Sequence, residues 1–532
     1  MESSQPSAQQ AKGPTKVSDQ SLWRDPVPPS KQYLDAMSAR VLDPSTAVPV
    51  DGVYPRPTAY IPGRLNISRL FDVPQLLSQL NEVAAGLGWS LIPERGAEKE
   101  AEHSTTLVQV ELTVADATSM RAPDAWALLQ NARKTFGIEA MQGVGLEHVL
   151  FIRTINPNPF HGPNPFHGPN PFHGPNPFHG PNPFHGPNSY GYSGRAPVAY
   201  VGPRPQRRSD KEIAGRRVVV GVLDTGCGKH PWLDHVVKHG FGSGAPPVGY
   251  SDLQTDPEVY PDQVGALDGV IDAYSGHGTF IAGLIHQACP DATIVSWRIV
   301  GSEGPIVESH LVAALNNIAE TVERHRDGVK GGHALDVLNL SMGYYHETPE
   351  DLLFDPTMYL VLKRISDCGT LIVCSAGNDG TARPLFPAAF APWLDGNGPI
   401  QQVGSELPVV SVGALNPNTS TDALFSNAGP WVRSYAPGAL LMSTLPVTFE
   451  GGLQPTNRLE AFSRVRESVD PDDFTGGFAT WSGTSFAAPL LAGRIAAHLN
   501  DELIEARGET TREEAVARTW RALVKETDLR PV

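Results

Sequence analysis

Short runs of apolar, mostly β-branched residues alternate with longer stretches of helical periodicity between residues 218 and 503. Such runs are typical of strands that are covered on both faces, and they read VVVGVL, ATIVSWRIV, LDVLNLS, TLIVCS and PVVSVG. Segments with helical spacing separate them, for example at 306–325 and 351–368. This alternation predicts an α/β fold with a doubly wound, mostly parallel sheet. In such sheets, ligands and chemistry lie beyond the carboxyl ends of the strands.

A smaller unit with a different order of elements precedes this region, at residues 54–156. Helical spacing at 72–88 and 124–137 is interleaved with four strand-like runs, LNISRLF, WSLIP, TTLVQVELTV and HVLFIRT. Asp72 is a candidate N-cap of the first helix, and Gly137 is placed to end the second. The order β-α-β-β-α-β predicts a small α+β, ferredoxin-like domain.

The remaining segments are expected to flank or connect these two units. Residues 1–53 are rich in Ser, Gln, Pro and Lys, so we expect a disordered tail. Residues 157–213 are expected to form a linker, and the large α/β domain is expected to span 214–505. Residues 506–532 are expected to form a C-terminal helix.

The hexapeptide NPFHGP occurs five times in succession from Asn158 to Pro187. Two prolines and one glycine per unit exclude a helix and remove donors from a sheet, which predicts an extended, partly polyproline-like connector. Metal capture by its histidines is the alternative, but isolated imidazoles lack preset geometry and supporting partners, so a spacer is favoured. The histidines concerned are His161, His167, His173, His179 and His185.

A basic run follows the repeat. Residues 204–217 hold six basic and two acidic side chains, which favours a solvated linker. A processing site is the alternative interpretation of the same run.

Composition excludes several classes of partner. The 532 residues carry a formal net charge of −16, so neither nucleic acid nor an anionic membrane is an expected partner. Four cysteines are too few for a disulfide scaffold, and we expect buried free thiols. No secretory signal or transmembrane segment is recognised in the sequence, which predicts a cytoplasmic protein.

Three short motifs carry candidate chemistry. Asp224, in LDTG, directly follows a predicted buried strand; His277 lies between two glycines in SGHGT; Ser485, in SGTSFAAP, opens a predicted helix. A hydroxyl at a helix N-terminus lies where unpaired N–H groups and the helix dipole favour a developing oxyanion. Each motif alone is more often an ordinary turn or helix cap than part of an active site.

The tripeptide Asp224-Thr225-Gly226 also matches the short signature of aspartic proteases. Those enzymes need two such carboxylates that share one proton, and only one copy occurs here. A dimeric, retroviral-type enzyme would leave His277 and Ser485 without a role, so this alternative is not favoured.

Taken together, the order Asp224, His277, Ser485 and the surrounding motifs resemble the subtilisin-like serine proteases over about 285 residues. The resemblance implies a serine endopeptidase of the peptidase S8 family, acting on proteins or peptides through an Asp/His/Ser triad and an acyl-enzyme intermediate. It further implies that Asn378, in SAGNDG, supplies an oxyanion-hole amide. Substrate contacts are expected from residues of the same motifs and of NLSMG, namely Ser341, Met342, Gly343, Ala376 and Gly377.

Two spacings look long for that family and imply surface insertions near 240–268 and 445–475. Because these insertions would border the cleft, they bear on substrate selectivity more than on chemistry. Calcium sites are frequent in the family, but no matching loop is recognised, so no metal and no cofactor is expected.

The N-terminal unit has the element order of the propeptides that assist folding of many subtilisin-like enzymes and then block the cleft. Intramolecular inhibition by residues 54–156 is therefore an expectation, and a partner-binding module is the alternative. Two further functions stay open for the large domain: a catalytically silent peptide-binding scaffold, and a transpeptidase that uses the same triad.

Overall fold

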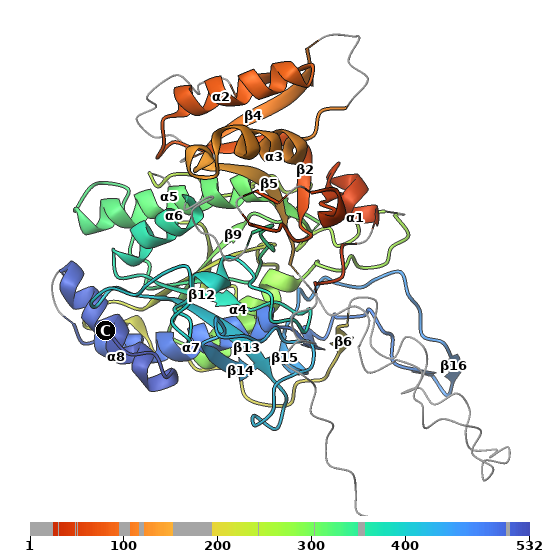
Figure 1. Cartoon of the computed structure of the whole chain (residues 1–532). Coiled ribbons are helices and arrows are strands. Elements are labelled where there is room, and N and C mark those ends of the chain that lie inside the picture. Colours follow the sequence, from red (N-terminus) through yellow and green to blue (C-terminus); the bar gives the residue numbers. More distant parts are fainter. Residues whose placement is uncertain are drawn as a thin grey trace, which may run out of the picture.

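The structure is a computed structural model of the chain (Figure 1). It describes residues 25–29, 31–47, 49–50, 52–94, 107–115, 122–152, 194–242, 244–265, 267–302, 304–348, 357–506 and 511–532. The NPFHGP repeats and their five histidines lie outside the described residues, so the predictions made for them stay predictions.

A seven-stranded, parallel sheet forms the centre of the large domain. Its order is β14-β13-β12-β11-β7-β9-β8. The strands are β7 (Val219–Asp224), β8 (Val237–His239), β9 (Thr293–Arg298), β11 (Val337–Leu340), β12 (Leu371–Ser375), β13 (Val409–Leu415) and β14 (Ser434–Pro437). From β7 the chain first forms β8 and β9 on one side of this strand and then β11 to β14 on its other side. Ligand sites of doubly wound sheets form where the order reverses in this way, here at the carboxyl end of β7.

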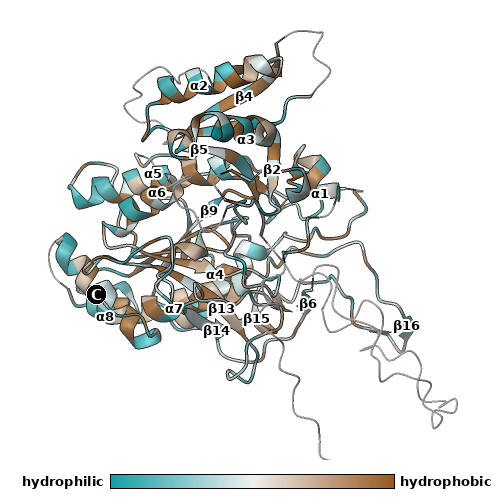
Figure 2. Ribbon diagram, in the orientation of Figure 1, coloured by the Kyte–Doolittle hydropathy of each residue, from teal (hydrophilic) through white to brown (hydrophobic). Residues whose placement is uncertain are grey.

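Helices cover both faces of this sheet, as predicted for a doubly wound fold (Figures 1 and 2). On one face α4 (His277–Ala288) and α7 (Thr484–Leu503) share one buried apolar cluster with the strands, and α8 (Arg512–Glu526) packs against α7. On the other face α5 (Glu308–Arg326) and α6 (Thr357–Ser366) contribute to a second cluster. The strands read as continuous apolar runs because both of their faces are buried. None of the helices in the described ranges is long and apolar enough to cross a membrane.

The N-terminal unit follows the predicted β-α-β-β-α-β order. Its elements are β2 (Ala59–Ser68), α2 (Val73–Gly86), β3 (Trp89–Pro93), β4 (Leu107–Val114), α3 (Ala125–Phe136) and β5 (Val144–Leu150). The strands pair antiparallel in the order β5-β2-β4-β3, and the helices bury Leu80 and Leu128 against them. Asp72 is the N-cap of α2, where its side chain accepts a hydrogen bond from the Gln75 N–H at 3.0 Å.

The two units share a sheet. Strand β10 (Ile306–Val307) of the large domain pairs antiparallel with β5, so that Ile306 lies opposite Leu150. Immediately beyond β5, Phe151 forms an antiparallel bridge with Gly343. The end of the N-terminal unit therefore lies as an extended strand between two segments of the large domain.

Two predicted boundaries are wrong. The predicted tail contains α1 (Lys31–Ala36) and β1 (Arg40–Val41), and β1 pairs with β2. The predicted linker is folded from residue 194 onward, where β6 (Ala196–Pro197) pairs with β18 (Phe478–Trp481). Polar and Pro-rich composition predicts a lack of ordered structure, but pairing with a strand from another part of the chain can order such segments.

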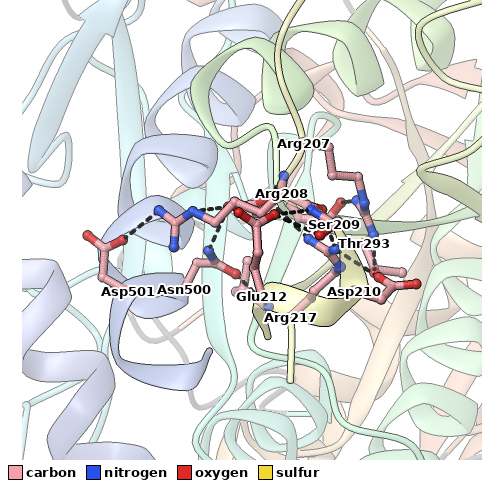
Figure 3. Close-up of polar contacts among 12 residues, drawn as sticks. Arg207, Arg208, Ser209, Asp210, Glu212, Arg217, Thr293, Asn500 and Asp501 are labelled. Atoms are coloured by element: carbon pink, nitrogen blue, oxygen red, sulfur yellow. Dashed lines mark hydrogen bonds and ion pairs between the residues drawn. The ribbon is translucent and has the colours of Figure 1, made fainter. Parts of the chain in front are cut away.

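The basic run at 204–217 is also not a solvated linker. Arg208 and Arg217 both pair with Asp291, and Arg216 makes a bidentate contact with Asp336 at 2.7 and 2.8 Å. Figure 3 shows three arginines of this run, Arg207, Arg208 and Arg217, directed at residues of the large domain. The guanidinium groups therefore fix the segment to the domain surface.

Smaller elements complete the fold. Strand β15 (Leu441–Thr444) pairs with β18, and β16 (Arg458–Ala461) and β17 (Arg464–Glu467) form a hairpin within the predicted insertion at 445–475. This hairpin projects from the body of the large domain (Figure 1). Within the described ranges, short 3-10 helices lie at Pro44–Thr46, Glu139–Met141, Asp210–Glu212 and Ala388–Phe390.

Candidate active site

Asp224 and His277 form a buried hydrogen-bonded pair at the carboxyl end of β7. The Oδ1 atom of Asp224 lies 2.7 Å from Nδ1 of His277, and neither side chain is exposed to solvent. Asp224 is the last residue of β7, and its Oδ1 also accepts the Thr225 N–H at 2.8 Å. The carboxylate is thus fixed at the point where the sheet order reverses.

Glycines allow His277 to approach this carboxylate. Helix α4 begins at His277, directly after Gly276, whose φ of 87° lies in the left-handed region that favours glycine. A Cβ on Gly278 would lie 2.1 Å from the Gly226 carbonyl oxygen, so the start of α4 packs directly against the turn after β7. The two flanking glycines in the motif therefore serve close backbone contact.

Ser485 lies in the first turn of α7, close to the end of β11. Its Oγ donates to the Ser341 carbonyl oxygen at 3.3 Å, and the Ser341 Oγ donates to the Ser485 carbonyl oxygen at 2.9 Å. The ring of Phe486, the next residue, lies 5.1 Å from the His277 ring. His277 Nε2 is buried and has no hydrogen-bond partner among the described residues, so the hydroxyl of Ser485 is directed away from it in this structure.

Asn378 lies in the same site, in the loop after β12. Its Oδ1 accepts two hydrogen bonds from Thr484, from N–H and Oγ1, both at 2.8 Å. The Gly377 N–H in turn donates to Thr484 Oγ1 at 3.0 Å. These bonds hold the side-chain amide of Asn378 beside the residue that precedes Ser485.

One pocket contains most of the predicted substrate-contact residues. Ser341, Met342, Gly343, Gly377 and Asn378 line it together with Ser485. Ala376 does not line it; its carbonyl oxygen accepts a hydrogen bond from Asn427, which also orders the loop around Asn378.

Phe151 of the N-terminal unit also lines this pocket, which the sequence did not indicate. Its N–H donates to the Gly343 carbonyl oxygen at 3.1 Å, and the Gly343 N–H donates back at 3.3 Å. Ile152, the next residue, is buried. Backbone pairing with an exposed strand edge is the way in which extended peptides are commonly bound.

Glu258 is a second site residue that the sequence did not indicate. It belongs to the insertion at 240–268, and its side chain accepts hydrogen bonds from Thr225 and Gly278, the residues that follow Asp224 and His277. Burial raises the pKa of the Glu258 carboxyl to about 7, against the opposing effect of hydrogen bonds from Thr225 and Thr279. The insertion therefore reaches the catalytic region, whereas the sequence assigned it to substrate selection.

Two of the four cysteines lie close to the site. Cys227 and Cys374 are buried free thiols, as expected, and burial raises the pKa of both. Their thiolate forms are therefore disfavoured, which agrees with a packing role.

Donor atoms that could hold a metal ion converge elsewhere, at the contact between the two units. His148, His346 and Glu347 place one ligand atom each within 4.8 Å of one another. His148 bridges two carboxylates, at 2.6 Å from Glu308 and 2.8 Å from Glu347, and Arg133 lies 3.5 Å from Glu347. This ion-pair network accounts for the buried charges without an ion.

Comparison with known proteins identifies the family of the large domain. A family model described as the subtilase family, Peptidase_S8, matches residues 215–527. The chain belongs to the subtilase family, which confirms the resemblance and the predicted fold class of the large domain.

Individual relatives are distant. The major intracellular serine protease of Bacillus subtilis (strain 168) is 26% identical over 195 residues, covering 34% of this chain and 50% of that protein. The intracellular serine protease of Paenibacillus polymyxa is 26% identical over 297 residues, covering 54% of this chain and 67% of that protein. A crystal structure of a cold adapted subtilisin-like serine proteinase is 19% identical, with a TM-score of 0.35 over 60% of this chain and 87% of that one.

Proposed function

We propose that this protein is a serine endopeptidase that hydrolyses protein or peptide substrates through Asp224, His277 and Ser485. The observation that carries the proposal is the buried 2.7 Å contact between Asp224 and His277 at the edge of the sheet where Ser485 and Asn378 also lie. Membership of the subtilase family and the similarity to two relatives named as intracellular serine proteases support it.

In the proposed first step, the Ser485 hydroxyl rotates from the Ser341 carbonyl toward His277 Nε2 and transfers its proton there. A serine hydroxyl is a weak nucleophile at neutral pH, so this base is required for attack on the scissile carbonyl. Asp224 holds the imidazole in the tautomer with a proton on Nδ1 and stabilises the imidazolium once it forms. As the tetrahedral intermediate collapses, His277 gives this proton to the leaving amine; His277 then takes a proton from water, which attacks the acyl-enzyme, and returns it to Ser485 Oγ as the acid product leaves.

The negative oxygen of the tetrahedral intermediate needs donors that are already in place. We assign this role to the side-chain amide of Asn378 and the backbone N–H of Ser485 at the start of α7. The two hydrogen bonds from Thr484 to Asn378 Oδ1 support this assignment, since they fix the orientation of the side chain and identify its nitrogen as the donor end.

We further propose that the N-terminal unit inhibits the enzyme within the same chain. The exchange of two backbone hydrogen bonds between Phe151 and Gly343, and the pairing of β5 with β10, support this. An extended substrate would need the same backbone donors and acceptors. The unit would therefore compete with substrate for as long as it remains docked.

We also propose a cytoplasmic location. Two relatives are named as intracellular serine proteases, which supports this location.

Digestion of a peptide mixture derived from a proteome, with cleavage sites determined by mass spectrometry, tests the proposed activity. Wild-type protein is expected to produce new peptide termini, and Ser485→Ala is expected to produce none. Intact peptides with both proteins would indicate a silent binding scaffold, and products joined to an added amine in place of water would indicate a transpeptidase.

A further inference from the structure

The side chain of Glu258 is buried and bonded on both of its oxygens. Only 1% of the residue is exposed. Oε1 accepts from Thr225 Oγ1 at 2.5 Å and from the Gly278 N–H at 3.2 Å, and Oε2 accepts from Thr279 Oγ1 at 2.6 Å. All three donors belong to the two motifs that hold Asp224 and His277.

These bonds join the two motifs to each other. Thr225 directly follows Asp224, and both its N–H and its hydroxyl lie within hydrogen-bond distance of Asp224 Oδ1, at 2.8 and 3.2 Å. Gly278 directly follows His277, and its N–H also reaches Thr225 Oγ1, at 2.8 Å. One carboxylate thus contacts the residue after each member of the pair.

Stability alone does not account for a carboxylate at this position. Among the residues that the structure describes, none forms an ion pair with Glu258, although the positive charge of the buried Arg195 guanidinium acts on it from beyond ion-pair distance. Burial of a carboxylate without a cation costs free energy, and an apolar side chain of similar size is usually at least as stabilising. Unlike an apolar side chain, the carboxylate can accept three hydrogen bonds at fixed positions.

We propose that Glu258 is a positioning residue that sets the distance and orientation between Asp224 and His277. This rests on the proposed function of the pair. Through Thr225 it orients the Asp224 carboxylate, and through Gly278 and Thr279 it fixes the first turn of α4, from which His277 projects. It touches neither the substrate nor the reacting atoms.

The test is a set of full-length variants, measured by the rate of Ser485 labelling with a fluorophosphonate and by kcat and KM on a peptide substrate. We expect Glu258→Ala to lower kcat about ten-fold or more, with KM within about two-fold of wild type, since two hydroxyls and an N–H lose their acceptor. Glu258→Gln keeps the size of the side chain and one carbonyl oxygen, so we expect its kcat to lie between those of wild type and Glu258→Ala. Asp268→Asn is the matched control, because it removes an exposed carboxylate from the same insertion, and wild-type rates are expected.

A double-mutant cycle separates positioning from general destabilisation. Thr279→Val removes one hydroxyl that donates to Glu258 and that also accepts the Gly228 N–H, so its effect should be smaller in the Glu258→Gln background than in wild type. If Glu258→Ala does not fold, Glu258→Gln and this cycle decide the result. Wild-type kcat in both Glu258 variants, or full additivity of Glu258→Gln and Thr279→Val, would overturn the inference. A wild-type protein that Ser485 probes do not label would instead refute the proposed function.

Discussion

The imidazole of His277 lies 2.7 Å from the carboxylate of Asp224, although the two residues are 53 positions apart in the chain. The contact forms because β7 ends in the middle of a parallel sheet and α4 begins beside it, with Gly278 packed directly on Gly226. This pair is the part of the proposed mechanism that the fold holds most rigidly.

Asp224→Asn should preserve the packing around the site and lose most of the catalytic activity. An amide at this position favours the wrong imidazole tautomer, and turnover in comparable triads falls about 10⁴-fold. We therefore expect kcat to fall by about that factor while the melting temperature changes little. A variant that retains more than about a tenth of wild-type kcat would show that Asp224 does not orient the base.

Asn378→Leu should lower kcat and leave KM nearly unchanged. Removal of one side-chain donor from an oxyanion site costs about 10²–10³ in turnover, because the interaction exists mainly in the transition state. Thr484→Val serves as a matched comparison, since it removes the hydroxyl that holds Asn378 Oδ1 but keeps the amide. We expect its effect to be smaller, and an equal loss of kcat in both variants would contradict the assigned role of Asn378.

Phe151→Pro should weaken docking of the N-terminal unit and raise the activity of the full-length chain. Proline has no N–H, so the 3.1 Å bond to the Gly343 carbonyl cannot form. Phe151→Ala retains that N–H and is the matched control for loss of the side chain. Initial hydrolysis rates of freshly purified, uncleaved protein should be highest for the proline variant. Equal rates for all three proteins would argue against inhibition by this segment.

The contact between the two units should lose stability in alkali. Burial alone lowers the pKa of His148, but Glu308 and Glu347 outweigh it and raise the pKa to about 10, from 6.5 for an unperturbed imidazole. Tyr344 and His346 lie against the same ring, and Arg133 contacts Glu347. Because the folded-state pKa is raised, the stabilisation is fully present below about pH 6.5 and is lost as the pH rises through about 10.

Melting temperatures of wild type and His148→Gln at several pH values test this prediction. The difference in melting temperature should be largest near about pH 6 and should shrink toward about pH 10, where the imidazole loses its proton. A difference that stays constant over that range would show that His148 contributes through packing instead of charge.

The sequence predicted the parts of the site whose signals are local. Asp224, His277 and Ser485 stand in motifs at strand ends and helix starts, and the apolar runs marked five of the seven strands of the central sheet but not β8 and β14. Glu258 could not be predicted, because it lies in an insertion whose only visible feature was length. Its role depends on contacts with Thr225, Thr279 and Gly278 that arise only in the folded chain.

Contacts between distant segments could not be predicted from the sequence either, because they too arise only in the folded chain. The ordering of residues 194–213 depends on Asp291, on Asp336 and on strand β18, none of which is close in sequence. The pairing of Phe151 with Gly343 likewise joins two segments that each read as an ordinary strand end. Local composition predicts how a segment behaves alone, whereas a partner elsewhere in the chain decides whether it is ordered.

The central claim is that Ser485 is a nucleophile activated by His277 and Asp224. Intact-mass measurement after incubation with a fluorophosphonate tests it most directly, on wild type, Ser485→Ala and His277→Ala. The account predicts a single adduct on wild type, located at Ser485 by peptide mapping, and no adduct on either variant over the same time. Absence of the adduct from wild type, or labelling of the His277→Ala protein at the wild-type rate, would contradict it.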